Sequence, residues 1–175
     1  MLTMKICLLG EGAVGKTSLR QKYLGVGFSS SYQMTVGADF SVKIVEGKHT
    51  YRFQIWDVAG QALFSAIRSL FYNGALGSLI VFDLTRPETL PALENWVTDF
   101  YRYSDKAPLV LLGNKADLKD ESEHVVKEDE INGFVKQLEK KHGINVPYFE
   151  TSAVTGQNTE EAFLLLGEMI LQEEV

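Results

Sequence analysis

This chain of 175 residues has a single cysteine, no excess of positive charge and no long hydrophobic run. Its one cysteine, Cys7, cannot form an internal disulfide and fits a reducing compartment, so we expect a cytoplasmic protein. Lys and Arg number 17 against 23 Asp and Glu, for a formal net charge of −6. With no basic stripe, general nucleic-acid binding is not expected. No run of 18 apolar residues exists, so no transmembrane helix is expected.

Sequence features that would divide the chain into parts are also missing. There is no internal repeat, low-complexity stretch or linker rich in proline and glycine. The length suits one domain with a hydrophobic core, and 45% hydrophobic with 23% charged residues is an ordinary globular balance. We therefore expect residues 1–175 to form a single domain.

The most informative segment present is residues 10–17, which read Gly-Glu-Gly-Ala-Val-Gly-Lys-Thr and directly follow the apolar run 6–9. This is the pattern G-x-x-x-x-G-K-[ST] between a strand and a helix, which is typical of a phosphate-binding loop. Its glycines permit a tight loop whose backbone N–H groups, with the helix N-terminus, face phosphate oxygens. We expect Lys16 to reach the β- and γ-phosphates and the Thr17 hydroxyl to bind Mg²⁺. The predicted nucleotide contacts here are Gly10, Glu11, Gly12, Ala13, Val14, Gly15, Lys16, Thr17 and Ser18.

A second motif, Asp57-Val58-Ala59-Gly60-Gln61, ends the strand-like segment 51–58. An acid at a strand end can hold Mg²⁺ through water, from the side opposite Thr17. Gly60 would present an unhindered N–H to a γ-phosphate, and Gln61 could orient the attacking water. The predicted catalytic residues are therefore Gln61 and Lys16.

A third motif, Asn114-Lys115-Ala116-Asp117, follows the apolar segment 109–112. The carboxylate of Asp117 can accept hydrogen bonds from both guanine N1–H and N2–H₂, a donor pair that adenine lacks. Lys115 could lie over the base, and Asn114 could tie neighbouring loops together. One alternative, a P-loop kinase or ATPase, leaves Asp117 without a purpose. Another alternative, a binding module locked on its nucleotide, is opposed by Gln61 but stays open because Ala62 follows that glutamine.

Strand-like segments alternate with segments of helical period, the pattern of a layered α/β domain. The residues of the hairpin signal Glu46-Gly47-Lys48 make two of the strands antiparallel neighbours in an otherwise parallel sheet. We expect a six-stranded mixed sheet with helices on both faces and the ligand at the carboxyl ends of the strands. The expected strands are 4–9, 38–45, 51–58, 78–84, 109–112 and 146–149.

Together, the three motifs resemble the Ras superfamily of small GTPases over nearly the whole chain, and segments 36–40, 56–61 and 71–75 are similar to the Rab family. The resemblance implies the P-loop NTPase fold of a small G protein, which binds GTP or GDP with Mg²⁺ and hydrolyses GTP slowly. It implies that Thr35 binds Mg²⁺ and the γ-phosphate and that Phe28 stacks edge-on to the guanine. It also implies that residues 151–153, with Ser152 and Ala153, support the base through backbone N–H groups.

The resemblance further implies a molecular switch with effector, exchange-factor and GTPase-activating partners, expected to be monomeric and to act in membrane or vesicle trafficking. Phe40, Trp56 and Phe71 match the aromatic triad that Rab proteins display to effectors. Four residues differ: Ala62-Leu63 stands where Rab proteins usually carry Glu-Arg, Val58 replaces their usual threonine, and Asn73 replaces their usual arginine. No prenylatable cysteine precedes Val175, so membrane attachment is expected only through a tail that this chain does not contain.

Overall fold

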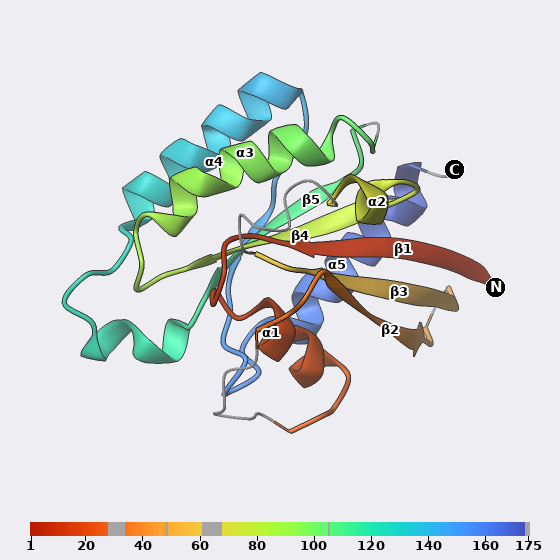
Figure 1. The fold of residues 1–175 in the computed structure, drawn as a ribbon, viewed down its shortest axis with the longest axis horizontal. Helices are drawn as coiled ribbons and strands as arrows, with labels where there is room; N and C mark the ends of the chain where they lie inside the picture. The colour runs from red at the N-terminus through yellow and green to blue at the C-terminus, as the bar shows by residue number, and fades with distance from the viewer. Residues whose placement is uncertain (28–33, 48, 61–67, 105, 174–175) are drawn as a thin grey trace.

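The computed structural model of the chain describes residues 1–27, 34–47, 49–60, 68–104 and 106–173 (Figure 1). All six predicted strands are present there, each with boundaries within two residues of the expected ones. The order of the elements is β1 (Leu2–Leu9), α1 (Lys16–Tyr23), β2 (Ala38–Val45), β3 (Tyr51–Val58), α2 (Ser69–Tyr72), β4 (Gly77–Asp83), α3 (Thr89–Phe100), β5 (Leu109–Asn114), the 3₁₀ helix η2 (Ala116–Glu121), α4 (Glu128–His142), β6 (Tyr148–Glu150) and α5 (Thr159–Glu173).

The strands form one sheet in the order β2-β3-β1-β4-β5-β6. The β2–β3 hairpin is antiparallel and every other pairing is parallel, as the turn signal between these strands predicts. In the parallel part, Leu8 lies opposite Asp57 and Asp83 lies opposite Asn114. Because parallel strands end at the same edge, the loops after β1, β3, β4 and β5 meet there.

Helices cover both faces of the sheet: α3 and α4 lie on one side, and α1 and α5 lie on the other (Figure 1). Alternation along β1 divides its side chains between the two layers, since Cys7 and Leu9 join the core under α3, whereas Ile6 and Leu8 join the core under α5. Burial raises the pKa of Cys7 to about 12, so the thiol is a neutral core group. In the described part of the chain, no helix is long and apolar enough to cross a membrane.

Local sequence signals fix the ends of α4. The backbone N–H of Lys127 donates to the carboxylate of Glu130 at 2.9 Å, which caps the start of the helix. Gly143 follows the last turn with φ of 67°, the left-handed conformation that glycine adopts at low cost. Acidic residues stand in the first turn and basic residues in the last, which complements the helix dipole.

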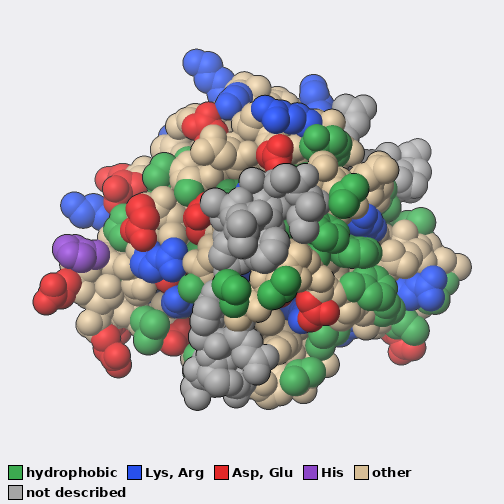
Figure 2. Space-filling model, in the orientation of Figure 1, with side chains coloured by type: hydrophobic (Ala, Val, Ile, Leu, Met, Phe, Trp, Pro, Cys, Tyr) green, Lys and Arg blue, Asp and Glu red, His purple; other side chains and the backbone are tan. Residues whose placement is uncertain are grey.

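The sheet is covered unevenly. Every residue of β4 is buried, whereas no residue of the edge strand β2 is buried. Phe40, Val42 and Ile44 alternate along β2 with about half of their surface exposed. Figure 2 shows hydrophobic side chains gathered over this part of the sheet, which is left free by α3 and α4.

Candidate nucleotide-binding site

The loop between β1 and α1 is curled tightly by its glycines. Gly10 and Gly15 have φ of 140° and 100°, which residues with a side chain rarely adopt. A Cβ on Gly10 would collide with the carbonyl of Val81, and one on Gly15 with the side-chain amide of Asn114. The ends of β4 and β5 therefore press directly against this loop, and both positions require glycine.

Lys16 folds back into the loop that precedes it. Its Nζ donates to the carbonyl oxygens of Gly10 at 2.7 Å and of Glu11 at 2.8 Å, and only 6% of the residue is exposed. Burial lowers the pKa of Lys16 to about 8, against the opposing effect of the nearby Asp57 and Glu11 carboxylates. The ammonium group thus lies inside the cradle where the phosphates of a nucleotide would enter.

Three oxygen-bearing side chains meet at the start of α1. The Thr17 hydroxyl donates to Oδ2 of Asp57, and its oxygen lies 3.1 Å from the hydroxyl oxygen of Thr35. Asp57 is fully buried, and its Oδ1 has no hydrogen-bond partner within the described residues. Burial raises the pKa of this carboxyl, while the bond from Thr17 and the charge of Lys16 oppose that rise.

This donor set fits a hard cation. Mg²⁺ prefers oxygen ligands, takes one or two carboxylates and keeps several waters. An unpartnered buried carboxylate oxygen beside two hydroxyls matches that preference. Among the described residues there is no group of three or more His, Cys, Asp or Glu side chains that could hold a different metal.

Gly60 brings the loop after β3 against the phosphate loop. A Cβ on Gly60 would collide with the backbone of Glu11 and Gly12, so the two segments are in close backbone contact. The carbonyl oxygen of Gly60 lies 3.5 Å from a guanidinium nitrogen of Arg68. Gln61 and Phe28, for which the sequence predicts roles in hydrolysis and base stacking, fall outside the described residues.

Asn114 connects the phosphate loop to the loop after β6. Its amide nitrogen donates to the carbonyl oxygen of Val14 at 2.9 Å, and its Oδ1 accepts from the hydroxyl of Thr151 at 3.2 Å. The side chain is almost completely buried. Both polar groups of the Asn114 side chain thus form hydrogen bonds within the protein. Through them Asn114 links its own loop, after β5, to the phosphate loop and to the loop after β6.

The residues after Asn114 form the other end of the site. The Ser152 hydroxyl donates to Oδ1 of Asp117 at 2.5 Å, while Asp117 itself remains exposed. Lys115 has φ of 67°, a left-handed conformation that is uncommon for a residue with a side chain. Its ammonium forms an ion pair with the buried carboxylate of Asp83 at 2.6 Å. Ala153 is buried beside Ser152.

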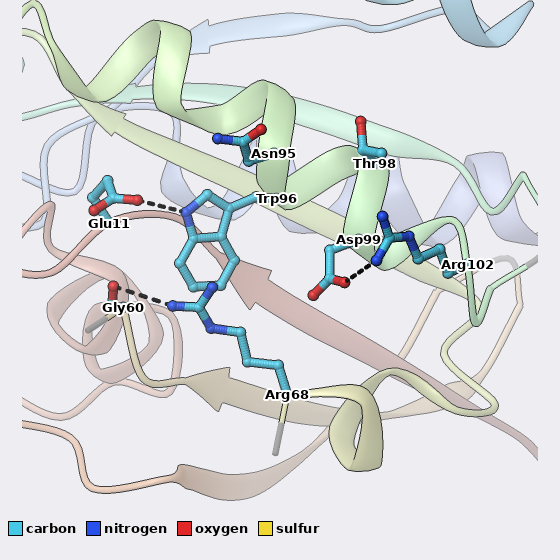
Figure 3. Close-up of a pocket in the computed structure, with 8 residues that line it drawn as sticks. All are labelled: Glu11, Gly60, Arg68, Asn95, Trp96, Thr98, Asp99 and Arg102. Atoms are coloured by element: carbon cyan, nitrogen blue, oxygen red, sulfur yellow. Dashed lines mark hydrogen bonds and ion pairs between the residues drawn. The ribbon is translucent and has the colours of Figure 1, made fainter. Parts of the chain in front are cut away.

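Glu11 and Trp96 form a contact that the sequence does not predict. Trp96, on α3, donates from its indole nitrogen to a carboxylate oxygen of Glu11 at 2.8 Å, and the guanidinium of Arg68 stacks on the indole ring at 3.6 Å (Figure 3). These residues and Gly60 line a cavity of about 390 Å³. Trp96 occupies a core position of the α3 pattern, so no sequence signal distinguishes it.

The structure therefore brings three of the predicted groups to one edge of the sheet: the phosphate loop, the oxygens of Thr17, Thr35 and Asp57, and the 114–117 segment with Ser152. The comparison with known proteins agrees with this geometry. Residues 5–172 match the sequence profile described as the Ras family.

The chain belongs to the Ras family.

Individual relatives place the chain near the Rab proteins within this family. It is 38% identical to the Ras-related protein RABG3f of Arabidopsis thaliana, over 91% of this chain and 78% of the relative. It is 37% identical to the Ras-related protein Rab7 of Cenchrus ciliaris (98% and 84%), and 36% identical to the Ypt/Rab-type GTPase Rab7 of Neurospora crassa (98% and 83%). The sequence-based prediction of a Rab-like small GTPase with a mixed six-stranded sheet is confirmed.

Membership in this family defines the activity. The protein is a GTP hydrolase that binds guanine nucleotide, and its partners include the regulators and effectors through which Ras-family GTPases act.

Proposed function

We propose that this Rab-like GTPase is a nucleotide-dependent switch whose site takes GTP or GDP with Mg²⁺ along the carboxyl edge of the sheet. One observation carries the proposal: the phosphate loop, an oxygen cluster with an unpartnered carboxylate and a guanine-type acidic loop converge on that edge. We further propose that residues 1–175 act as one domain and as a monomer.

At the phosphate end, the backbone of residues 10–18 cradles the phosphates and Lys16 neutralises the β- and γ-groups. The proposed Mg²⁺ ligands are the hydroxyls of Thr17 and Thr35 and, through water, Asp57. Their mutual contacts support this role, since all three oxygen groups already lie together. The cation would offset charge on the phosphate oxygens.

Hydrolysis requires a positioned water and stabilisation of charge on the transferred phosphate. We assign the first task to Gln61 and the second to Lys16, whose ammonium is held at the inner wall of the loop. The N–H of Gly60 would contact the γ-phosphate, and its close approach to Gly12 supports that placement. Residues 25–37 contain no arginine, so we expect slow hydrolysis by the protein alone and stimulation by an arginine from an activating partner.

At the base end, Asp117 selects guanine by accepting from N1–H and N2–H₂. The bond from Ser152 orients its carboxylate and leaves acceptor positions free for the base. Lys115 lies over the base and Phe28 stacks against its edge, while the backbone of Ser152 and Ala153 supports it.

Phe40, Trp56 and Phe71 form the proposed effector surface. Ring centroids lie 5.2 Å apart for Phe40 and Trp56 and 5.8 Å apart for Trp56 and Phe71, so the three side chains form one cluster from β2, β3 and α2. Thr35 precedes Phe40 by five residues, and Gly60 lies between Trp56 and Phe71 in the sequence. Because both would contact the γ-phosphate, loss of that phosphate should change the cluster. A partly exposed aromatic cluster is the kind of surface that binds protein partners.

The relatives bear Rab7 and RABG3 names, and we propose that this chain likewise acts in membrane or vesicle trafficking. Effector, exchange-factor and activating proteins would be its partners. We propose no nucleic-acid partner for this protein.

A direct experiment identifies the nucleotide. Purified protein is denatured, the released nucleotide is separated by chromatography, and single-turnover hydrolysis of added GTP is followed in parallel with and without Mg²⁺. We expect guanine nucleotide in the released fraction and slow conversion of GTP to GDP that depends on Mg²⁺. Release of adenine nucleotide, or binding of GTP that is never hydrolysed, would overturn the proposal.

A further inference from the structure

The turn that joins β4 to α3 is held by its own side chains. The backbone N–H of Arg86 donates to the carbonyl oxygen of Asp83 at 3.0 Å. The Thr89 hydroxyl donates to the carbonyl oxygen of Arg86 at 2.7 Å and accepts from the N–H of Asp83 at 3.0 Å. The Thr85 hydroxyl donates to Oδ1 of Asp83 at 2.7 Å. These contacts fix the directions of the two charged side chains that leave the turn.

One of them reaches the base end of the site. Asp83 is fully buried, and its Oδ2 forms the 2.6 Å ion pair with Lys115. The other oxygen of this carboxylate is already occupied by the N–H and hydroxyl of Thr85. Asp83 therefore holds the ammonium of Lys115 at a defined position.

The second charged side chain reaches the phosphate end. Arg86 donates from its guanidinium to the carbonyl oxygen of Gly12 at 3.1 Å, and a second nitrogen lies 3.3 Å from a carboxylate oxygen of Glu88. Gly60 packs against the peptide bond that joins Glu11 to Gly12. The guanidinium is thus attached to the part of the phosphate loop that lies nearest the proposed γ-phosphate contact.

We propose that residues 83–89 form a bracket that retains the bound nucleotide, with Asp83 as a positioning residue for the base loop and Arg86 as a positioning residue for the phosphate loop. The inference rests on the proposed function of the site. It assigns roles to two residues outside the three nucleotide motifs, and it attributes nucleotide residence time to the rigid β4–α3 turn.

The consequences for the two ends differ. Loss of the Asp83 carboxylate frees Lys115 over the base, which GDP and GTP share, so release of both nucleotides should accelerate equally. Loss of the Arg86 guanidinium frees Gly12 beside the γ-phosphate, so release of a triphosphate should accelerate more than release of a diphosphate. A general loss of stability would change both nucleotides alike in both variants.

The test measures dissociation of fluorescent GDP and of a fluorescent non-hydrolysable GTP analogue from the full chain with Mg²⁺. We expect Asp83→Asn to accelerate both about tenfold, equivalent to ~1.4 kcal/mol. Arg86→Ala should accelerate the triphosphate about tenfold and the diphosphate roughly twofold, and Arg86→Lys should restore part of the difference. If Asp83→Asn does not fold, Thr85→Val removes the hydroxyl that orients the carboxylate and should give a smaller acceleration of the same kind.

A matched control pair lies at the C-terminal end of α3, with Asp99 in its last turn and Arg102 just after it. Arg102, which is exposed, and Asp99, which is half-buried, form an ion pair at 3.6 Å (Figure 3), so Arg102→Ala and Asp99→Asn repeat the chemical changes away from the bracket. We expect wild-type release from both controls. Wild-type release from Arg86→Ala, or equal acceleration of the two nucleotides in it, would overturn the inference. Absence of guanine-nucleotide binding in the wild-type protein would instead overturn the proposed function.

Discussion

Strands β4 and β2 have nearly the same length but opposite environments. All seven residues of β4 are buried between helical layers, whereas the eight residues of β2 include none that is buried. β4 leads into the turn that contacts both Gly12 and Lys115, while β2 displays Phe40, Val42 and Ile44 at the surface. The difference separates two tasks: one half of the sheet holds the loops in place, and the other half presents a surface that can respond.

The energetics of the two halves should differ accordingly. Segments with few buried apolar contacts open at lower free energy than core strands. The base loop follows β5, in the packed half. Thr35 precedes the exposed strand β2, and Gly60 follows its hairpin partner β3; five of the eight β3 residues are buried, so the lower opening free energy applies to β2. In such a switch the base loop keeps its conformation, while the segments that contact the γ-phosphate change when that phosphate is lost.

The largest expected effect concerns the packed half. Asp117→Asn should weaken GTP binding by about 3–5 kcal/mol, because two hydrogen bonds between the guanine and a charged carboxylate become mismatched. Binding of xanthine nucleotides should improve, since xanthine presents a carbonyl there. Isothermal titration with both nucleotides checks this, with Asp120→Asn, an exposed acid of the same 3₁₀ helix, as the control. Unchanged GTP affinity in Asp117→Asn would contradict the assignment.

A pair of identical substitutions compares the two halves directly. Val110 lies fully buried on β5, whereas Val42 is 46% exposed on β2. Val110→Ala should lower the free energy of unfolding by roughly 2–3 kcal/mol, because it removes two packed methyl groups and leaves a cavity. Val42→Ala should change it by no more than about 0.5 kcal/mol. Denaturant unfolding with bound GDP measures the free energy of unfolding of both variants. Equal destabilisation by the two substitutions would contradict the proposed difference between the two halves of the sheet.

The residue expected to orient the attacking water, Gln61, follows the β2–β3 hairpin in the sequence. Gln61→Leu should slow single-turnover GTP hydrolysis by the isolated protein roughly tenfold, or ~1.4 kcal/mol in the barrier, because leucine cannot orient water. Nucleotide affinity should stay as in the wild type, which provides the internal control. Hydrolysis at the wild-type rate would exclude Gln61 from the reaction.

The smallest effect expected is an optical one. With Trp96→Phe as the background, Trp56 is the single remaining tryptophan, and its emission should change when a non-hydrolysable GTP analogue replaces GDP. The reason is that its neighbours Phe40 and Phe71 lie on segments that follow the proposed γ-phosphate contacts. The change should correspond to ~1–3 kcal/mol of coupling between nucleotide and this surface. Identical emission spectra in the two states would show that the aromatic cluster does not respond to the bound nucleotide.

Much of the fold was predictable because its signals are local. The glycines of the phosphate loop, the hairpin turn and the acid-to-base order of α4 each act within a few residues, and the structure contains the elements that they predict. Phe40, Trp56 and Phe71 lie together in the structure, while their role as an effector surface stays a prediction.

The contacts that were missed join distant segments. Asp83 follows a buried run at the carboxyl end of a strand, as Asp57 does, so its position was a usable signal; its partner Lys115 was not visible in the sequence. The bond from Trp96 to Glu11 spans 85 residues, and that of Arg86 to Gly12 spans 74. Such pairs depend on how α3 packs over the sheet, which helical periodicity does not determine.

Hydrogen exchange in two nucleotide states tests whether one half of the sheet holds the base while the other half responds to the γ-phosphate. Amide exchange is compared between the protein bound to GDP and the protein bound to a non-hydrolysable GTP analogue, both with Mg²⁺. We expect greater protection with the GTP analogue for residues 34–45, 51–60 and 68–73. We expect no change for residues 109–117 and 148–153, where the base would be held in both states. Identical exchange in the first set, or an equal change in both sets, would contradict the division between a fixed half and a responding half.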